Sequence, residues 1–185
     1  MPIPASIRIV GLGNVLMGDD AFGPAVVSAI ADRYEFDEEV EVLDLGTPGG
    51  DLVPHLAGAS LLVVVDTVKS GAAPGTVQVF TRDALLAQPL EPRVSPHDPG
   101  LKNALLMLEF AGIGPAEMFL VGAVPEKVAS WPGRTPPVTA AIEPAIAAVL
   151  TLLAARGIQP RRRPAPSHAA PWWNAPVEGF TTFAL

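Results

Sequence analysis

Cysteine is absent from the 185 residues of this chain. Its absence excludes disulfide bonds, thiolate zinc sites, iron–sulfur clusters and a cysteine nucleophile. Basic residues are also scarce, because 12 Lys and Arg stand against 19 Asp and Glu, which gives a formal net charge of −7 at pH 7. This charge argues against a nucleic-acid binder and against docking on an anionic membrane. The one dense basic run, Arg161 to Arg163, lies in a proline-rich C-terminal segment.

Long uninterrupted apolar runs are missing as well. The longest candidate, residues 140–155, contains Glu143 and Pro144 and falls short of the ~20 apolar residues that span a bilayer. The N-terminal "MPIPASIRIV" lacks the basic and apolar regions of a secretory signal. We therefore expect a cytoplasmic protein, with no membrane partner. Since 49% of the residues are apolar and 17% are charged, a folded globule is expected rather than disorder.

Strand and helix patterns alternate along the chain. The run at 60–68, "SLLVVVDTV", is apolar without alternation and predicts a strand buried on both faces, as at the centre of a parallel sheet. The alternating run at 75–81 predicts a strand near an edge. Together the patterns predict an α/β fold: a single three-layer domain with a mostly parallel central sheet flanked by helices, phosphorylase/hydrolase-like. The other expected strands are 7–13, the part of "VEVLDLG" that ends at Asp44, and 117–125. The expected helices are 21–34, 49–58, 98–112 and 135–157.

Capping residues and prolines set the expected boundaries. Asp98 is expected to cap the helix at 98–112, with Pro99 at its first position, and Thr135 to cap a long closing helix that ends at Gly157. From Gln159 onward prolines recur every few residues without periodicity. We therefore expect a domain at 1–158 and a flexible tail at 159–185, in which Trp172 and Trp173 lie on the surface or touch a partner.

The glycine turn "GLGNVLMGDD", residues 11–20, follows the first strand and resembles a dinucleotide-binding turn. However, Leu16 occupies the place of the third glycine of that motif. Asp19 and Asp20 also put negative charge where the helix N-terminus would receive a phosphate. A nucleotide-binding protein is therefore disfavoured. Helix capping explains one carboxylate and leaves the other as a candidate functional group.

Two further residues have the setting of metal ligands. Asp66 ends the central strand, at the edge where open α/β sheets bind ligands, and Asp20 follows the first strand in the same sense. His97 lies in "VSPHDPG", where the positive end of the following helix favours a neutral imidazole. Asp20, Asp66 and His97 together would form an open O,N ligand set that suits nickel, zinc or a similar divalent ion. A turn or capping role remains the alternative for each carboxylate.

Six segments, in order, resemble the maturation endopeptidases of [NiFe]-hydrogenases. They are "GLGNVLMGDDAFG", "DLGTPGGDL", "VVVDTV" followed by "APGTV", "SPHDPGL", "LVGAVPE" and "TPPVTAAIEPAI", and the resemblance covers residues 7 to about 157. Two positions depart from the family pattern: Ala21 replaces a frequent glycine after the acid pair, and Leu45 replaces the first glycine of Asp-Gly-Gly.

The resemblance implies a peptidase that removes a C-terminal extension from the hydrogenase large-subunit precursor after nickel insertion. It also implies that Asp20, Asp66 and His97 contact the precursor's nickel, so that no cofactor is tightly bound, although zinc or cadmium can occupy the site. The protease is expected to act as a monomer. A water activated by the metal or by a carboxylate is the expected attacking group, with Asp44 a candidate catalytic residue.

Other mechanisms and functions remain open at this point. An aspartic-protease pair of carboxylates is a possible mechanism, but residues 66–68 read Asp-Thr-Val rather than Asp-Thr-Gly. A nickel-handling hydrogenase assembly factor without proteolysis would use the same three ligands. Motif spacing does not separate this assembly factor from a protease; only the resemblance favours proteolysis.

Overall fold

A five-stranded sheet forms the centre of the protein. The computed structural model describes residues 7–48, 52–87, 100–130, 133–166, 171 and 173. The strands follow the order β3-β1-β4-β6-β5. Four of them are parallel: β1 (Ile7–Leu12), β3 (Val40–Gly46), β4 (Leu61–Thr67) and β6 (Glu117–Ala123). The edge strand β5 (Val77–Thr81) runs antiparallel to β6. The predicted α/β class, the central position of β4 and the edge position of β5 are confirmed.

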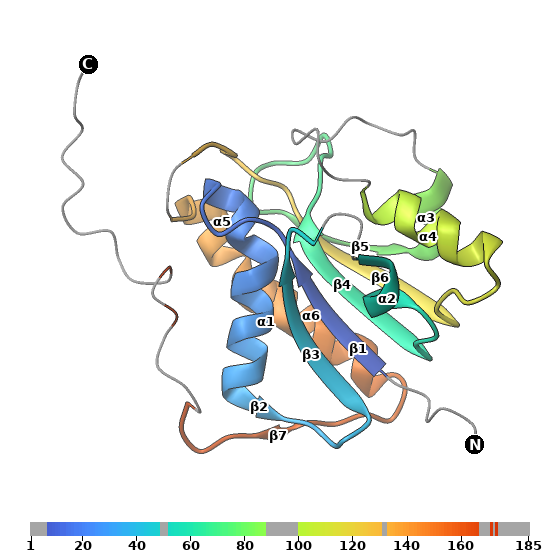
Figure 1. Ribbon diagram of the computed structural model, residues 1–185. Coiled ribbons are helices and arrows are strands. Elements are labelled where there is room, and N and C mark those ends of the chain that lie inside the picture. The colour runs from blue at the N-terminus through green and yellow to red at the C-terminus, as the bar shows by residue number, and fades with distance from the viewer. Residues whose placement is uncertain are drawn as a thin grey trace.

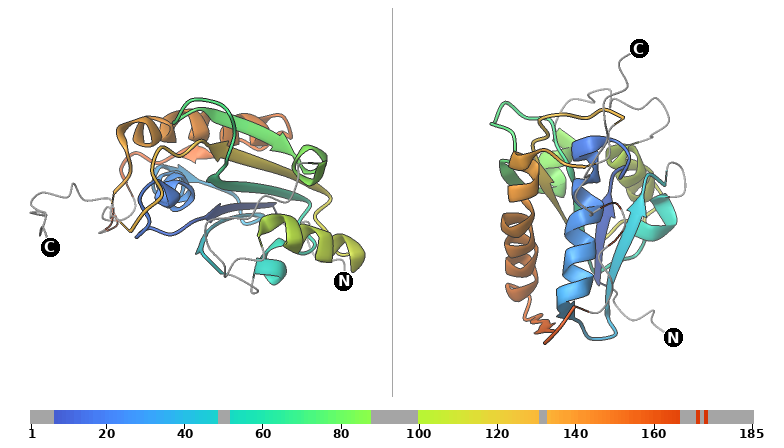
Figure 2. Two further views of the ribbon diagram at one scale, coloured as in Figure 1. Left: turned by 90° about the horizontal axis from the view of Figure 1, so that it is seen from above. Right: turned by 90° about the vertical axis from the view of Figure 1, so that its left-hand side faces the viewer.

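Helices cover both faces of the sheet and complete the three layers (Figures 1 and 2). One face carries α1 (Phe22–Arg33), α5 (Pro136–Ala140) and α6 (Ile142–Ala154). The other carries α2 (Leu52–Leu56), α3 (Arg82–Ala87) and α4 (Leu101–Phe110). The carboxyl ends of the parallel strands lie at the upper end of Figure 1, beside the short 3-10 helix η1 (Gly18–Ala21) and α5.

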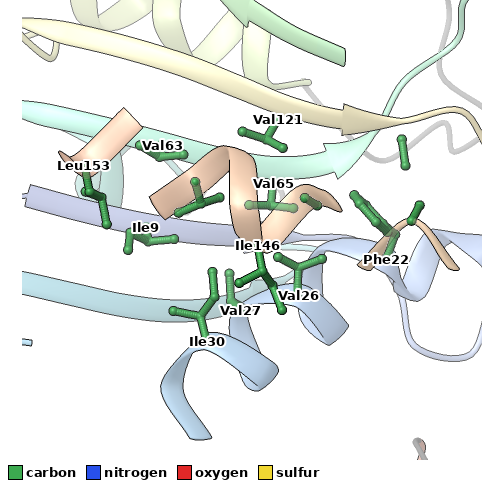
Figure 3. Packing of buried hydrophobic residues seen from close by; sticks show 14 of the residues in the cluster. Ile9, Phe22, Val26, Val27, Ile30, Val63, Val65, Val121, Ile146 and Leu153 are labelled. Carbon is green, nitrogen blue, oxygen red and sulfur yellow. The ribbon is translucent and has the colours of Figure 1, made fainter. Parts of the chain in front are cut away.

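Alternate residues of the strands feed two hydrophobic cores. Ile9, Val63 and Val121 lie on the face covered by α1 and α6, where Phe22 and Ile146 also pack (Figure 3). The intervening residues of β1 and β4, such as Val10 and Val64, lie in the second cluster, with α2 and α4. All residues of β4 before Thr67 are buried, which explains why its sequence is apolar without alternation.

The predicted closing helix is two helices, α5 and α6, joined at Ala141. Pro144 explains the break, because it lacks the N–H that would continue the hydrogen-bond ladder of α5. Thr135 occupies the N-cap position of α5, as predicted, but its side chain makes no capping hydrogen bond and its hydroxyl donates to Asp19 instead. The buried side of these two helices consists of Val138, Ile146, Val149 and Leu153, among others.

Residues Pro136–Ala154 are long and apolar enough to cross a membrane by length and composition alone. No run of this length was expected from the sequence, in which Glu143 and Pro144 interrupt the longest apolar stretch. In the structure one side of this stretch packs on the sheet, with Val138 and Val149 fully buried in the core shared with α1. A core helix meets the same criterion of length and composition, so this finding is weak evidence for a membrane span.

Other elements also differ from those expected, and helix α3 was not predicted. Helix α4 begins at Leu101 with Gly100 as its N-cap, so the predicted cap at Asp98 is wrong; Asp98 itself lies outside the described residues. A short antiparallel pair, β2 (Tyr34–Glu35) and β7 (Arg161–Arg162), was not predicted. It places the beginning of the segment after Gln159 against the end of α1.

Candidate active site

Asp20 and Asp66 come together at the carboxyl ends of two neighbouring parallel strands. Asp20 lies in η1, which follows β1, and Asp66 lies near the end of β4, which pairs with β1. Thr67 contacts both: its backbone N–H donates to Asp66 Oδ1 at 2.7 Å, and its hydroxyl donates to Asp20 Oδ1 at 3.3 Å. Asp66 is 2% exposed. Thr67 thus contacts both carboxylates at this edge of the sheet, and their role as joint ligands of one ion stays a prediction.

The turn after β1 brings Asp20 back over the strand ends. Gly13 has a φ of +136°, and a Cβ at this position would lie 1.9 Å from the backbone oxygen of Asp20, so only glycine fits. The backbone N–H of Asn14 donates to Asp20 Oδ2 at 2.8 Å. Both oxygens of the Asp20 carboxylate thus have protein donors that fix its orientation.

Asp19 has a different role from its neighbour. Its side chain is fully buried, and Oδ2 accepts hydrogen bonds from the backbone N–H groups of Glu126 and Lys127, both at 2.8 Å. Thr135 donates its N–H to Oδ1 at 2.7 Å and its hydroxyl to Oδ2 at 3.0 Å. Asp19 therefore ties η1 to the loop between β6 and α5, whereas Asp20 faces the strand ends. The two adjacent carboxylates at the end of the glycine turn therefore have separate roles.

Asp44 lies on β3, beside the same loop but apart from the Asp20–Thr67–Asp66 contacts. The residue as a whole is exposed, and its Oδ1 accepts the N–H of Gly46 at 3.0 Å. Its carboxyl group is nevertheless partly shielded from water by neighbouring atoms, which raises its pKa. The N–H of Gly13 donates to the carbonyl of Gly46 at 2.9 Å, which links the β1 and β3 loops. Asp44 lines a pocket of 380 Å³ with Asn14 and Trp173. The prediction of a catalytic role for Asp44 stays a prediction.

His97 lies outside the described residues, within 88–99. Within the described part of the chain, no cluster of three His, Cys, Asp or Glu side chains could hold a metal. The predicted set requires His97 as its third member, so the ligand set stays a prediction. Thr67 and Asn14 were missed by the sequence analysis. Thr67 directly follows Asp66, but its contact with Asp20 depends on the pairing of β1 with β4, which has no local signal in the sequence.

Comparison with known proteins decides the family. A family model described as hydrogenase maturation protease matches residues 24–152, which is more than half of the chain. The chain belongs to the hydrogenase maturation protease family. It is therefore a peptidase, as the sequence resemblance implied.

Individual relatives support this assignment. The protease is 38% identical over 154 residues to the hydrogenase 2 maturation protease of Escherichia coli, covering 83% of this chain and 93% of the relative. It is 37% identical to the hydrogenase expression/formation protein HoxM of Azotobacter vinelandii, over 83% and 74% of the two chains. The solved hydrogenase-maturating endopeptidase of E. coli superposes on 85% of the protease and 98% of its own chain, with a TM-score of 0.78 and 36% identity.

Proposed function

We propose that this protease removes the C-terminal extension from the precursor of a [NiFe]-hydrogenase large subunit after nickel insertion. Asp20, Asp66 and His97 bind the nickel that the precursor presents. The nickel belongs to the substrate, and the protease carries no tightly bound cofactor of its own. Zinc or cadmium can occupy the same site in the laboratory, because an O,N ligand set also suits these ions.

One observation carries this proposal: Thr67 donates a hydrogen bond to Asp20 and another to Asp66. Two carboxylates at the carboxyl ends of adjacent parallel strands are well placed to receive a cation. They would repel a phosphate, which argues against the nucleotide-binding alternative. Membership of a protease family argues against an assembly factor without proteolysis.

Nickel binding would act mainly by positioning. Once the ion is held by three side chains, the peptide bond to be cut is fixed beside the strand ends, and such orientation can lower a barrier by ~7–11 kcal/mol. A water attacks the peptide carbonyl, activated by the ion or by a carboxylate, with Asp44 as the candidate among the nearby carboxylates. Its raised pKa favours the acceptance of a proton.

The test compares nickel-loaded with nickel-free precursor and follows release of the C-terminal peptide by mass spectrometry. We expect cleavage only of the loaded precursor, and a loss of about 100-fold or more in rate for Asp20→Asn, Asp66→Asn and His97→Ala. Asp83→Asn and His55→Ala are matched controls, because both residues are exposed and lie outside the site. They should cleave as the wild type does.

Two outcomes would contradict the proposal. Cleavage of nickel-free precursor at the wild-type rate would mean that nickel is not the recognition element. Wild-type protein that binds loaded precursor but releases no peptide would instead support the assembly-factor alternative. Undiminished cleavage by all three site variants would remove the predicted ligand set.

A further inference from the structure

A pocket of 380 Å³ adjoins the candidate nickel site on its β3 side. Its walls are residues 13–15 of the loop after β1, residues 44–47 at the end of β3, and Trp173. Asn14 belongs both to this wall and to the site, because its N–H donates to Asp20 Oδ2 at 2.8 Å. A peptide held beside Asp20 therefore lies within reach of the pocket.

Trp173 forms one wall of the pocket and does not fill it, because the 380 Å³ remain with the indole in place. The side chain is half-buried, and the Arg134 guanidinium carbon lies 5.9 Å from the centroid of its ring. Arg134 precedes Thr135, whose N–H and hydroxyl are bonded to the buried Asp19. The contact with Arg134 thus connects Trp173 to the loop between β6 and α5, which also holds Asp19.

The lining favours an uncharged group with an apolar part, because polar side chains line the pocket beside the apolar ones. Val15, Leu45 and the indole of Trp173 supply apolar surface. Asp44 is the one titratable side chain among the lining residues, and its carboxylate would repel an acidic group. Gly13 and Gly46 contribute no side chains, so backbone can approach closely from that side. The volume of 380 Å³ is that of an open surface depression rather than an enclosed cavity.

We propose that this pocket is a specificity subsite that binds an apolar side chain of the precursor next to the peptide bond that is cut, and that Trp173 is its outer wall. The inference rests on the proposed function, since it takes the precursor to be the substrate. Trp173 contacts the substrate in this view but does not act on the reacting atoms. The C-terminal segment of the protease thereby contributes to substrate choice.

The first experiment measures KM and kcat on nickel-loaded precursor for two variants of the full chain. Trp173→Ala removes the wall, and Thr47→Trp fills the pocket from an exposed lining position. We expect KM to rise about tenfold in each, because one change removes an aromatic contact and the other occupies its space, with kcat within about twofold of the wild type. Phe110→Ala and Thr151→Trp are the matched controls, because both positions are exposed on α4 and α6.

A second experiment identifies the occupant. Each precursor residue flanking the cut bond is replaced in turn by Asp and by Trp. We expect the wild type to reject both changes at one position, and Trp173→Ala to accept the Trp substitution there. In that case the larger pocket of Trp173→Ala accepts the larger precursor side chain. A purely structural role of Trp173 would not give this result.

The outcomes separate the two proposals. If wild-type protease does not cleave nickel-loaded precursor, the proposed function fails. If it does cleave but Trp173→Ala and Thr47→Trp behave like their controls, the subsite alone is overturned. A lower KM in Trp173→Ala would also overturn it, because the C-terminal segment would then compete with the precursor rather than help to bind it.

Discussion

The adjacent carboxylates Asp19 and Asp20 experience opposite surroundings. Asp19 is fully buried and accepts four hydrogen bonds from residues more than a hundred positions away in the chain. Asp20 is partly exposed and shares Thr67 with Asp66. A buried carboxylate with several donors stabilises the folded state, because its removal leaves N–H groups without an acceptor. The first residue therefore holds the loop that presents the second.

Asp19→Ala should lower the free energy of unfolding by about 3 kcal/mol or more, because three backbone N–H groups and a hydroxyl lose their acceptor. Denaturant unfolding followed by circular dichroism measures this change. Asp83→Ala, at a side chain 89% exposed, is the control and should change stability by less than about 0.5 kcal/mol. A loss no larger than that of the control would show that water replaces Asp19 without cost.

Asp44 gives a pH-dependent prediction. Partial burial raises the pKa of its carboxyl above the ordinary value of 3.8, so the folded state binds this proton more tightly than the unfolded chain. The contribution of the Asp44 carboxyl to the stability of the folded state therefore falls as pH rises through its raised pKa. Asp44→Asn, which keeps the oxygen that accepts the Gly46 N–H, should gain in Tm relative to wild type between about pH 3 and about pH 7.

This gain is measured by thermal unfolding at about pH 3 and about pH 7. The proteins compared are wild type, Asp44→Asn and the exposed control Asp83→Asn. A Tm difference between Asp44→Asn and wild type that stays constant with pH would contradict the prediction. Because Asp44 is also a candidate catalytic residue, the cleavage rate of Asp44→Asn is a separate measurement. Its loss would support a catalytic role but would leave the stability argument unchanged.

At the scale of elements, close approach of α1 to the sheet decides where η1 lies. Gly23 makes this approach possible: a Cβ there would lie 2.1 Å from the carbonyl oxygen of Leu12 and 2.4 Å from that of Val65. Both oxygens belong to backbone, which cannot move aside as a flexible side chain can. Because α1 follows η1 directly, its distance from β1 and β4 also sets the position of Asp20.

Gly23→Ala should force α1 away from β1 and β4, with a loss of about 1–3 kcal/mol or more in stability. We also expect slower cleavage of loaded precursor, because Asp20 moves with the start of the helix. Gly71→Ala is the control: a Cβ there meets nothing within 4 Å and the backbone has no left-handed φ. Equal stability of the two variants would show that α1 does not depend on this contact.

Elements with a strong local sequence pattern were predictable, and those formed by distant pairing were not. The apolar run of β4 was correctly predicted because burial acts on the local pattern. The pairing of β2 with β7 joins residues about 125 positions apart and has no such signal. The break between α5 and α6 did have a signal, Pro144, whose effect on the helix the periodicity concealed.

For the whole molecule, both hydrophobic clusters draw their residues from 7–158. The segment after Gln159 adds the β2–β7 pair, an ion pair between Arg161 and Glu35 at 2.9 Å, and Trp173 at the pocket. The residues of β7 and Trp173 lie outside both clusters, although Tyr34 of β2 packs against the first. We therefore propose that residues 1–158 form a domain that folds without the C-terminal segment.

A chain ending at residue 158 should remain folded, with Tm lowered by about 2–4 °C, because exposed ion pairs and short strands contribute about 1 kcal/mol. Its KM for loaded precursor should rise as in Trp173→Ala. A chain ending at residue 173, which keeps Trp173, is the matched control and should retain the KM of the full chain. Calorimetry and cleavage kinetics on the three chains test both statements. An unfolded or aggregated 1–158 chain would contradict the domain boundary.

The sequence by itself determined the alternation of strands and helices, the buried centre at β4, and the two carboxylates that follow strands, because periodicity and strand-end polarity are local properties. Only the tertiary structure decided the different roles of Asp19 and Asp20. Asp19 is turned into the protein by donors from Glu126, Lys127 and Thr135, and Asp20 is turned to the strand ends by Thr67. Trp173 reaches the pocket from far along the chain. Such contacts depend on strand order and loop packing, which no local pattern of residues specifies.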